Sequence, residues 1–246
     1  MSIEHKIALV TGASRGIGAA TAVKLAAQGY KVCVNYQRNS QAAEKVVNTI
    51  KQQGGVAFAF QADVSQEQEV KALFAAIDKQ LGAITHLVNN VGILMQQSKL
   101  IDMDAQRINK ILSTNVTSYF LCCKEALQRM QTGSAIVNVS SGAARSGSPN
   151  EYIDYAASKG AIDTLTKGLS LEVAPQGIRV NGVRPGFIHT DMHADGGEPN
   201  RIARLSPQIP LQRGGTTEEV ANSIAWLLSD EASYVTGSII DVTGGK

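Results

Sequence analysis

The stretch Thr11-Gly-Ala-Ser-Arg-Gly-Ile-Gly18 follows a short apolar run and opens a segment of helical character. Glycines at such a turn allow a tight bend and a close approach of the backbone to a ligand. The free N–H groups at a helix start can then bind a pyrophosphate. The spacing is G-x-x-x-G-x-G, and a Walker loop is excluded because no Lys-Ser/Thr pair follows the last glycine. The stretch therefore predicts a β-α unit that binds a dinucleotide.

The rest of the chain alternates short apolar runs with segments of helical period. The runs are rich in Val and Ile, as in strands buried on both faces of a parallel sheet. They are Lys6–Val10, Lys31–Tyr36, Val56–Phe60, His86–Asn89, Ala135–Ser140 and Ile178–Val183. This alternation predicts right-handed crossovers and an α/β, Rossmann-type doubly wound sheet with helices on both faces. The default strand order is 3-2-1-4-5-6.

Three of the intervening helices have recognisable beginnings. Ser65 with Gln68, and Thr216 with Glu219, have the spacing of a capping box. Ser40 is expected to cap a third helix.

Length and composition indicate one globular domain. The 246 residues carry a net charge of +2 and contain no linker and no repeat of fixed period, so residues 1–246 are read as a single domain. The segment from about 191 to 215 holds three of the six prolines and little periodicity, which predicts a lid or a surface loop. The small charge argues against nucleic-acid and anionic-membrane partners.

The same features indicate a soluble, cytoplasmic protein. No apolar stretch approaches the roughly 18 residues that span a bilayer, and the first residues do not form a signal peptide. The three cysteines lack metal-ligand spacing, as suits a reducing compartment. His189, Asp191 and His193 alternate in a pattern that could suit a metal, but they are interpreted as incidental loop residues, so no metal site is expected.

The end of the second predicted strand bears on the choice of dinucleotide. It reads Asn35-Tyr36-Gln37-Arg38, with no carboxylate to bind the adenosine ribose hydroxyls. Arg15 in the glycine loop and Arg38 just past the strand are cations suited to a 2′-phosphate. NADP(H) is therefore favoured over NAD(H), although both arginines could be ordinary surface cations.

Tyr155 and Lys159 are spaced i and i+4 on a predicted helix and so share one face. A cation about 4 Å from the phenol, at an effective dielectric near 20, contributes about 4 kcal/mol. That would bring the tyrosine pKa from about 10 to near 7, where a general acid–base works best. Tyr152 has no lysine at i+4.

Chemically unusual residues come directly after the predicted strands, where open α/β sheets bind their ligands. Each could be an ordinary turn residue, and their joint order is the stronger signal. They are Asp63 after the third strand, Asn89, Asn90 and Gly92 after the fourth, Ser140 and Ser141 at the end of the fifth, and Pro185 and Gly186 after the sixth.

On these residues the chain resembles the short-chain dehydrogenase/reductase family, nearly from end to end. The matching pieces, in chain order, are Thr11–Gly18, Asp63-Val64, Asn89-Asn90-Val91-Gly92, Asn115, Ser141, Tyr155-Ala-Ala-Ser-Lys159, Pro185-Gly186, Thr190, Tyr234-Val-Thr-Gly237 and Asp241-Val-Thr-Gly-Gly245. The resemblance implies a seventh strand, a homotetramer and an NAD(P)-dependent enzyme that interconverts an alcohol and a carbonyl.

The resemblance also implies a role for each matching residue. Tyr155 would exchange a proton with the substrate oxygen, Lys159 would lower its pKa and hold the nicotinamide ribose, Ser141 would hydrogen-bond the substrate, and Asn115 would anchor a relay water. The residues expected to contact the dinucleotide are Gly12, Ser14, Arg15, Gly16, Ile17, Gly18, Asn35, Tyr36, Arg38, Asp63, Val64, Asn90, Gly92, Tyr155, Lys159, Pro185, Gly186, Ile188 and Thr190.

Three departures from the family pattern stand out. Val91 replaces the usual Ala, Ser141 and Tyr155 are one position further apart than is commonest, and Arg184 precedes the Pro-Gly pair. The spacing leaves Ser140 open as an alternative to Ser141. Arg184 could favour a polar or anionic substrate.

The sequence around Arg145–Tyr152 and Val183–Phe187 is most similar to sugar- and polyol-type members such as glucose 1-dehydrogenases. Two alternatives stay open: a non-catalytic NADP(H)-binding regulatory or scaffold protein, and a nucleotide-sugar epimerase. The intact set of Asn115, Ser141, Tyr155 and Lys159 argues against the first, and the lack of a substrate domain against the second.

Overall fold

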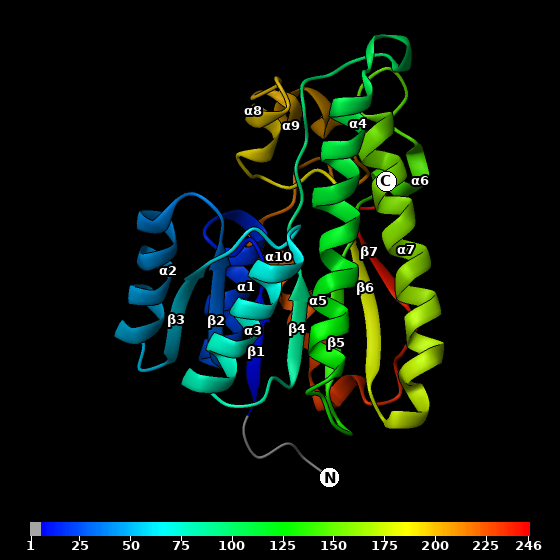
Figure 1. Ribbon diagram of the computed structural model, residues 1–246. Coiled ribbons are helices and arrows are strands. Elements are labelled where there is room, and N and C mark those ends of the chain that lie inside the picture. Colours follow the sequence, from blue (N-terminus) through cyan, green and yellow to red (C-terminus); the bar gives the residue numbers. More distant parts are fainter. Residues whose placement is uncertain (1–5) are drawn as a thin grey trace.

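The computed structural model describes residues 6–246, in which seven parallel strands form one sheet (Figure 1). The strand order β3-β2-β1-β4-β5-β6-β7 confirms the predicted order and adds the seventh strand at the edge. The strands are β1 Ile7–Val10, β2 Lys31–Tyr36, β3 Val56–Gln61, β4 His86–Asn89, β5 Ala135–Val139, β6 Arg179–Pro185 and β7 Ile239–Val242. The reading of the first residues as no signal peptide rests on residues 1–5, outside the described part.

Helices cover both faces of this sheet, as the alternation predicts (Figure 1). They are α1 Gly16–Ala27, α2 Ser40–Gln52, α3 Glu67–Gln80, α4 Ala105–Leu112, α5 Ser118–Leu127, α6 Ala143–Ser146, α7 Ile153–Val173, α8 Met192–Asp195, α9 Arg201–Leu205 and α10 Thr217–Leu228. Within residues 6–246, none of them is long and apolar enough to cross a membrane.

Alternation along β1 shows how the two layers of the core arise. Ala8 and Val10 pack with α1, α2 and α10, whereas Ile7 and Leu9 pack with α3, α5 and α7. Successive side chains of a strand point to opposite faces, so a run that is apolar throughout has to be covered on both. All four residues are buried, which explains why the first strand shows no polar alternation.

The helix starts agree with prediction at one of three places. Thr216 and Glu219 form the predicted capping box at α10. The capping box predicted for Ser65 is wrong: α3 begins at Glu67, and the Ser65 hydroxyl donates instead to the Asp63 carboxylate at 2.7 Å. Ser40 is the first helical residue of α2 rather than its cap.

The cap of α2 is Asn39, whose side-chain oxygen accepts from the Ala42 amide at 2.9 Å. At α2 the neighbouring Asn39 therefore makes the capping bond expected of Ser40, whereas α3 has no side-chain cap and Ser65 donates to Asp63 instead.

The three glycines of the Thr11–Gly18 turn are each required for a separate reason. Gly12 has φ +61° and Gly16 has φ +56°, a conformation that side chains with a Cβ rarely adopt. Gly18 is needed for space, since a Cβ there would lie 2.6 Å from the Gly12 carbonyl oxygen and 2.6 Å from Asn90 Nδ2. The turn is thus packed against the end of β4 before any ligand binds.

The segment 191–215 lies above the carboxyl ends of the strands (Figure 1). It is less irregular than its sequence indicates, since it contains α8, α9 and a 3₁₀ turn at Ser206–Gln208. Arg201 and Ile202 in α9 are 7% exposed, so part of the segment packs on the body of the domain.

Replacing Gly18 by Ala should destabilise the protein by roughly 1–3 kcal/mol, because the methyl group meets backbone that cannot move aside. Urea unfolding measures this change. Gly168→Ala is the matched control: Gly168 also lies inside a helix, and a Cβ there meets nothing within 4 Å. That substitution should stabilise by up to about 1 kcal/mol through helix propensity. Equal stability changes in the two variants would contradict the packing argument.

Candidate functional site

A cavity of about 750 Å³ opens at the carboxyl ends of the central strands. Ser141, Tyr155 and Lys159 line it together, although the chain separates Ser141 from Lys159 by a loop, α6 and the start of α7. Predicted cofactor residues line the same cavity, namely Ile17, Asn90, Gly92, Pro185, Gly186, Ile188 and Thr190. The parallel sheet therefore gathers these residues at one edge.

The two candidate serines differ in what they face. The Ser140 hydroxyl is buried and donates to the Lys159 carbonyl oxygen at 3.1 Å. The Ser141 hydroxyl interacts with the phenol of Tyr155. The geometry thus puts Ser141, and not Ser140, beside the tyrosine, despite the unusual spacing along the chain.

The Tyr155 phenol is buried at the cavity wall, and its acidity differs from the expectation. Burial raises the pKa of Tyr155 above its ordinary value of 10, and the hydrogen bond with Ser141 offsets this only in part. The expected lowering toward 7 is absent because the Lys159 ammonium nitrogen lies 5.7 Å from the ring centroid and is bonded elsewhere.

The Lys159 ammonium group is held by two oxygen atoms. It donates to the Val139 carbonyl at 2.8 Å and to the Tyr119 hydroxyl at 3.2 Å. The residue is 2% exposed. Burial lowers the pKa of Lys159 to about 7, with Asp163 acting in the opposite direction. The side chain is thus poised to change charge near neutral pH.

Asn115 lies in a short π-helical stretch, Ser113–Thr117, between α4 and α5. Its side-chain oxygen accepts from the Ile93 amide at 2.8 Å, and its Nδ2 donates to Ser158 Oγ at 3.2 Å. Single turns of π-helix often mark functional sites. Asn115 therefore joins the loop after β4 to α7, one residue before Lys159.

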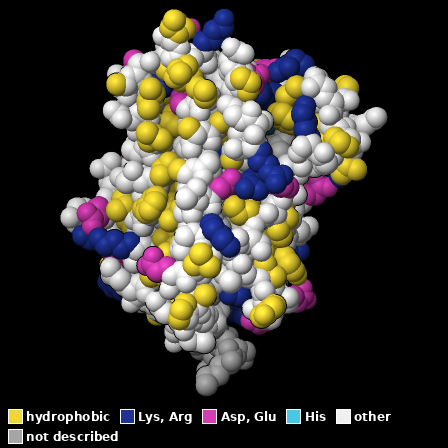
Figure 2. Space-filling model, turned by 90° about the vertical axis from the view of Figure 1, so that its right-hand side faces the viewer, with side chains coloured by type: hydrophobic (Ala, Val, Ile, Leu, Met, Phe, Trp, Pro, Cys, Tyr) yellow, Lys and Arg dark blue, Asp and Glu magenta, His cyan; other side chains and the backbone are white. Residues whose placement is uncertain are grey.

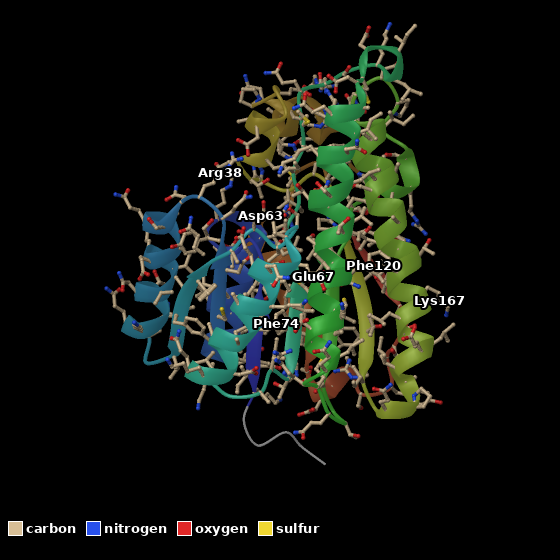
Figure 3. The ribbon with its side chains drawn as sticks, in the orientation of Figure 1. Arg38, Asp63, Glu67, Phe74, Phe120 and Lys167 are labelled. Carbon is tan, nitrogen blue, oxygen red and sulfur yellow. The ribbon has the colours of Figure 1, made fainter. Side chains whose placement is uncertain are left out.

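The two predicted phosphate ligands, Arg15 and Arg38, are not among the residues that line the cavity. Arg38 is exposed just beyond β2, at the same edge as Asp63 beyond β3 (Figure 3). Arg15 pairs with two carboxylates of the 191–215 segment, Asp191 at 3.7 Å and Asp195 at closer range. This pairing connects the glycine turn to α8.

Two predicted cofactor residues use their side chains within the fold. Asn35 is buried; its Oδ1 accepts from the Gly12 amide at 3.2 Å, and its Nδ2 donates to the Ala62 carbonyl at 3.1 Å. Asn90 Nδ2 donates to the carbonyls of Thr11 and Gly12 at 3.0 and 3.2 Å. Val64 is buried in the core, while Ser14 and Tyr36 are partly exposed at the same edge.

Arg184 does not line the cavity, which corrects the idea that it selects a polar or anionic substrate. It bonds to Asp163 at 2.9 Å and to Asp241 at 3.3 Å, and so joins β6 to α7 and β7. Its role in this structure is to connect these elements.

Sequence reasoning missed several residues of the cavity. Tyr152 lines it and donates its hydroxyl to the Gly196 carbonyl at 2.9 Å. Arg201 also lines it, 5.1 Å from the centroid of the Tyr152 ring. No motif marks Arg201. Tyr119 could have been found, because it stands four residues after Asn115 and so shares its helical face.

Comparisons with known proteins agree with this arrangement. The family model described as enoyl-(acyl carrier protein) reductase matches residues 12–246. An uncharacterized oxidoreductase of Escherichia coli, YgfF, is 64% identical over 98% of this chain and 99% of its own. The 3-oxoacyl-[acyl-carrier-protein] reductase FabG of Staphylococcus aureus is 42% identical over 98% of this chain and 97% of its own.

Solved structures show the same likeness. A dehydrogenase/reductase from Sinorhizobium meliloti superposes with a TM-score of 0.93 at 32% identity, covering 99% of this chain and 96% of its own. A short-chain dehydrogenase from Burkholderia cenocepacia in complex with NADP superposes with a TM-score of 0.90 at 33% identity. The match covers 98% of this chain and 97% of that chain. The chain therefore belongs to the short-chain dehydrogenase/reductase family, whose members are oxidoreductases acting on carbonyl or hydroxyl groups.

Proposed function

We propose that this protein is an NADP(H)-dependent oxidoreductase that interconverts an alcohol and a carbonyl on a small molecule, with Tyr155 as the general acid–base. The observation that carries the proposal is the meeting of Ser141, Tyr155 and Lys159 on one cavity wall. A protein that only bound the nucleotide would not need a proton donor, a hydrogen-bonding hydroxyl and a cation at one point.

The residues around the cleft fit a dinucleotide. Gly16 faces Thr190 across it, and a Cβ on Gly16 would lie 3.5 Å from Thr190 Cγ2. A Cβ on Gly92 would lie 3.4 Å from Lys159 Nζ. The glycine turn therefore lies close to the stretch after β6, and Gly92 lies close to Lys159. Gly12–Gly18 would hold the pyrophosphate, and Gly92, Ile188 and Thr190 the nicotinamide end.

When bound, the nicotinamide supplies or accepts the hydride. In carbonyl reduction Tyr155 gives its proton to the substrate oxygen, and Ser141 donates a hydrogen bond to the same oxygen. Lys159 in its charged form stabilises the phenolate that remains. In alcohol oxidation the phenolate takes the proton back. Asn115, bonded to Ser158 and to the Ile93 backbone, positions the lysine side of the relay.

Preference for NADP(H) over NAD(H) rests on Arg15 and Arg38. Neither β2 nor the residues directly after it offer a carboxylate to the ribose, whereas Arg38 follows β2 and Arg15 lies in the glycine turn. A NADP complex of a structural relative supports the choice. In the present arrangement Asp191 and Asp195 partly neutralise Arg15, so a 2′-phosphate has to displace them.

The substrate is expected to be polar in part. Tyr152, Glu151 and Arg201 line one side of the cavity, and Leu94, Phe187 and Met192 provide apolar contact. The sugar- and polyol-type resemblance stays a prediction, and the FabG relatives add 3-oxoacyl thioesters to the candidates. A turnover screen over sugars, polyols, ketones, quinones and 3-oxoacyl thioesters is the direct test.

We further propose that the protein acts in the cytoplasm as a homotetramer, with segment 191–215 as its lid and no nucleic-acid or membrane partner. Apolar side chains lie among charged ones on the side of the molecule that carries α7 (Figure 2). On α5 and α7, Phe120 is 52% and Leu171 65% exposed, and association between copies would bury such side chains.

Replacing Tyr155 by Phe should lower kcat at least about 100-fold, because the proton donor is lost, while NADPH still binds. Steady-state rates and a fluorescence titration with NADPH measure the two effects. Tyr152→Phe, on the same wall, should keep kcat within about tenfold of the wild type. Full activity of Tyr155→Phe would contradict the assigned role. A wild type that binds NADPH but turns over nothing would favour the regulatory or scaffold alternative.

Arg15→Ala and Arg38→Ala should each weaken NADPH binding by about tenfold or more, with little effect on NADH, because only NADPH carries the 2′-phosphate. Isothermal titration with both nucleotides measures the ratio of affinities. Lys24→Ala removes a cation from the last turn of α1, at the far end of the helix from the glycine turn, and serves as the control. Unchanged selectivity in both arginine variants would overturn the phosphate assignment.

Asp195→Asn should tighten NADPH binding by up to about fivefold and leave NADH binding unchanged. The Arg15–Asp195 pair is about half exposed, so breaking it costs little, and the freed arginine meets the phosphate without a competing carboxylate. The same titration checks this. Weaker NADPH binding in the variant would show that Asp195 assists the nucleotide and does not compete with it.

A further inference from the structure

Tyr119 on α5 lies directly beneath the proposed catalytic pair, and the family motifs do not include it. It is 1% exposed, and its hydroxyl donates to the Val139 carbonyl at 2.9 Å. The same hydroxyl oxygen accepts from Lys159 Nζ at 3.2 Å, while Nζ also donates to Val139 at 2.8 Å. The ammonium nitrogen, the phenol oxygen and the carbonyl oxygen thus form a closed triangle.

We propose that Tyr119 is a positioning residue for Lys159: its hydroxyl, anchored on the Val139 carbonyl, holds the lysine in its charged form at the cavity wall. This inference rests on the proposed function, since it concerns the group that acts on Tyr155. Tyr119 itself touches neither substrate nor nucleotide in this scheme.

The direction of each hydrogen bond supports the assignment. A phenol has one proton, and Tyr119 gives it to Val139, so the oxygen lone pairs remain free for the lysine. Burial raises the pKa of Tyr119 well above 10, which keeps this hydroxyl neutral at working pH. Lys159 has three N–H bonds, of which two are used here, so one remains for the proposed phenol or ribose partner.

In the described part of the chain, no carboxylate lies close enough to the Lys159 ammonium group to balance its charge directly. Among residues 6–246, none lies within 4 Å of Lys159 Nζ. The titratable groups facing it are Tyr155 and Asp163 from α7 and Tyr119 from α5, with Cys122 and Cys123 behind Tyr119. Asp163, already bonded to Arg184, acts only at longer range. Apart from the longer-range effect of Asp163, the two neutral acceptors are the groups that directly bind the ammonium.

Removing the Tyr119 hydroxyl should change the pKa of Lys159 in one definite direction. A hydrogen bond to a charged group favours the charged form, so Tyr119→Phe lowers the pKa of Lys159, by about one pH unit. Carbonyl reduction needs the ammonium form, and its rate falls as pH rises through that pKa. In the plot of kcat against pH, the fall on the alkaline side should therefore move to lower pH by the same amount. Val139 keeps its bond from Lys159, so the variant leaves no orphaned carbonyl.

The experiment follows Lys159 by carbon-13 NMR of the lysine Cε signals in the protein without added nucleotide, with the signal assigned from Lys159→Met. Titrations compare the wild type, Tyr119→Phe and Thr166→Val. Thr166 is the matched control, because its hydroxyl is equally buried on α7 and bonds to Asn138 instead of Lys159. Rates of NADPH-dependent reduction between about pH 5 and 9 are measured alongside, with the best substrate of the screen.

The expected result is that the titration midpoint of Lys159 lies about one pH unit lower in Tyr119→Phe and is unchanged in Thr166→Val. The alkaline side of the kcat–pH profile should shift by the same amount as the midpoint. An unmoved midpoint in Tyr119→Phe, or an equal shift in Thr166→Val, overturns the proposal. A shifted Lys159 midpoint without a shift in the alkaline side of the kcat–pH profile also overturns it. If the midpoint shifts and the wild type reduces no substrate, the proposed function fails while the positioning of Lys159 by Tyr119 stands.

Discussion

The cavity is organised around one buried cation, the ammonium group of Lys159. A charge removed from water needs acceptors in place of its hydration shell. The Val139 carbonyl at the end of β5 and the Tyr119 hydroxyl on α5 provide them. Because Lys159 is bonded to both acceptors, the end of β5 and the helices α5 and α7 meet at one point. The orientation of α7, and with it the placement of Tyr155, follows from how the ammonium is held.

A second set of hydrogen bonds keeps the two ends of the cleft at a constant separation. Asn89 donates to Asn138 at 2.9 Å, and Asn138 donates to Thr166 at 3.0 Å, so a buried chain of side chains links β4, β5 and α7. At the other end, Asn35 and Asn90 bind the backbone of the glycine turn. Hydrogen-bonded networks of buried amides make an interior more rigid. The glycine turn and α7, which carries Tyr155, are therefore both tied to the central strands by buried side chains.

Much of this could be predicted from sequence, because apolar runs and glycine spacing depend on local geometry. The strand order, the two-sided core and the capping box at Thr216 all follow from such patterns. The predicted caps at Ser65 and Ser40 are wrong because Ser65 donates to Asp63 and because Asn39 accepts from the α2 amide instead of Ser40. The pKa of Tyr155 was misjudged for a different reason. Its spacing from Lys159 is local, but burial and the bond from Lys159 to Val139 depend on tertiary packing.

The ion pairs made by segment 191–215 could not be predicted from the sequence. They also show why the net charge says little about this protein. A total of +2 does not say where the charges lie, whereas the local balance at Arg15 bears on the proposed cofactor site. There a cation of the glycine turn is shared with Asp191 and Asp195 at the start of the proposed lid. Exposed ion pairs of this kind are weak, whereas a phosphate is a doubly charged ligand with several acceptor oxygens. A nucleotide phosphate bound by Arg15 would compete with these two carboxylates, so the proposed cofactor site and α8 would be coupled through a single guanidinium group.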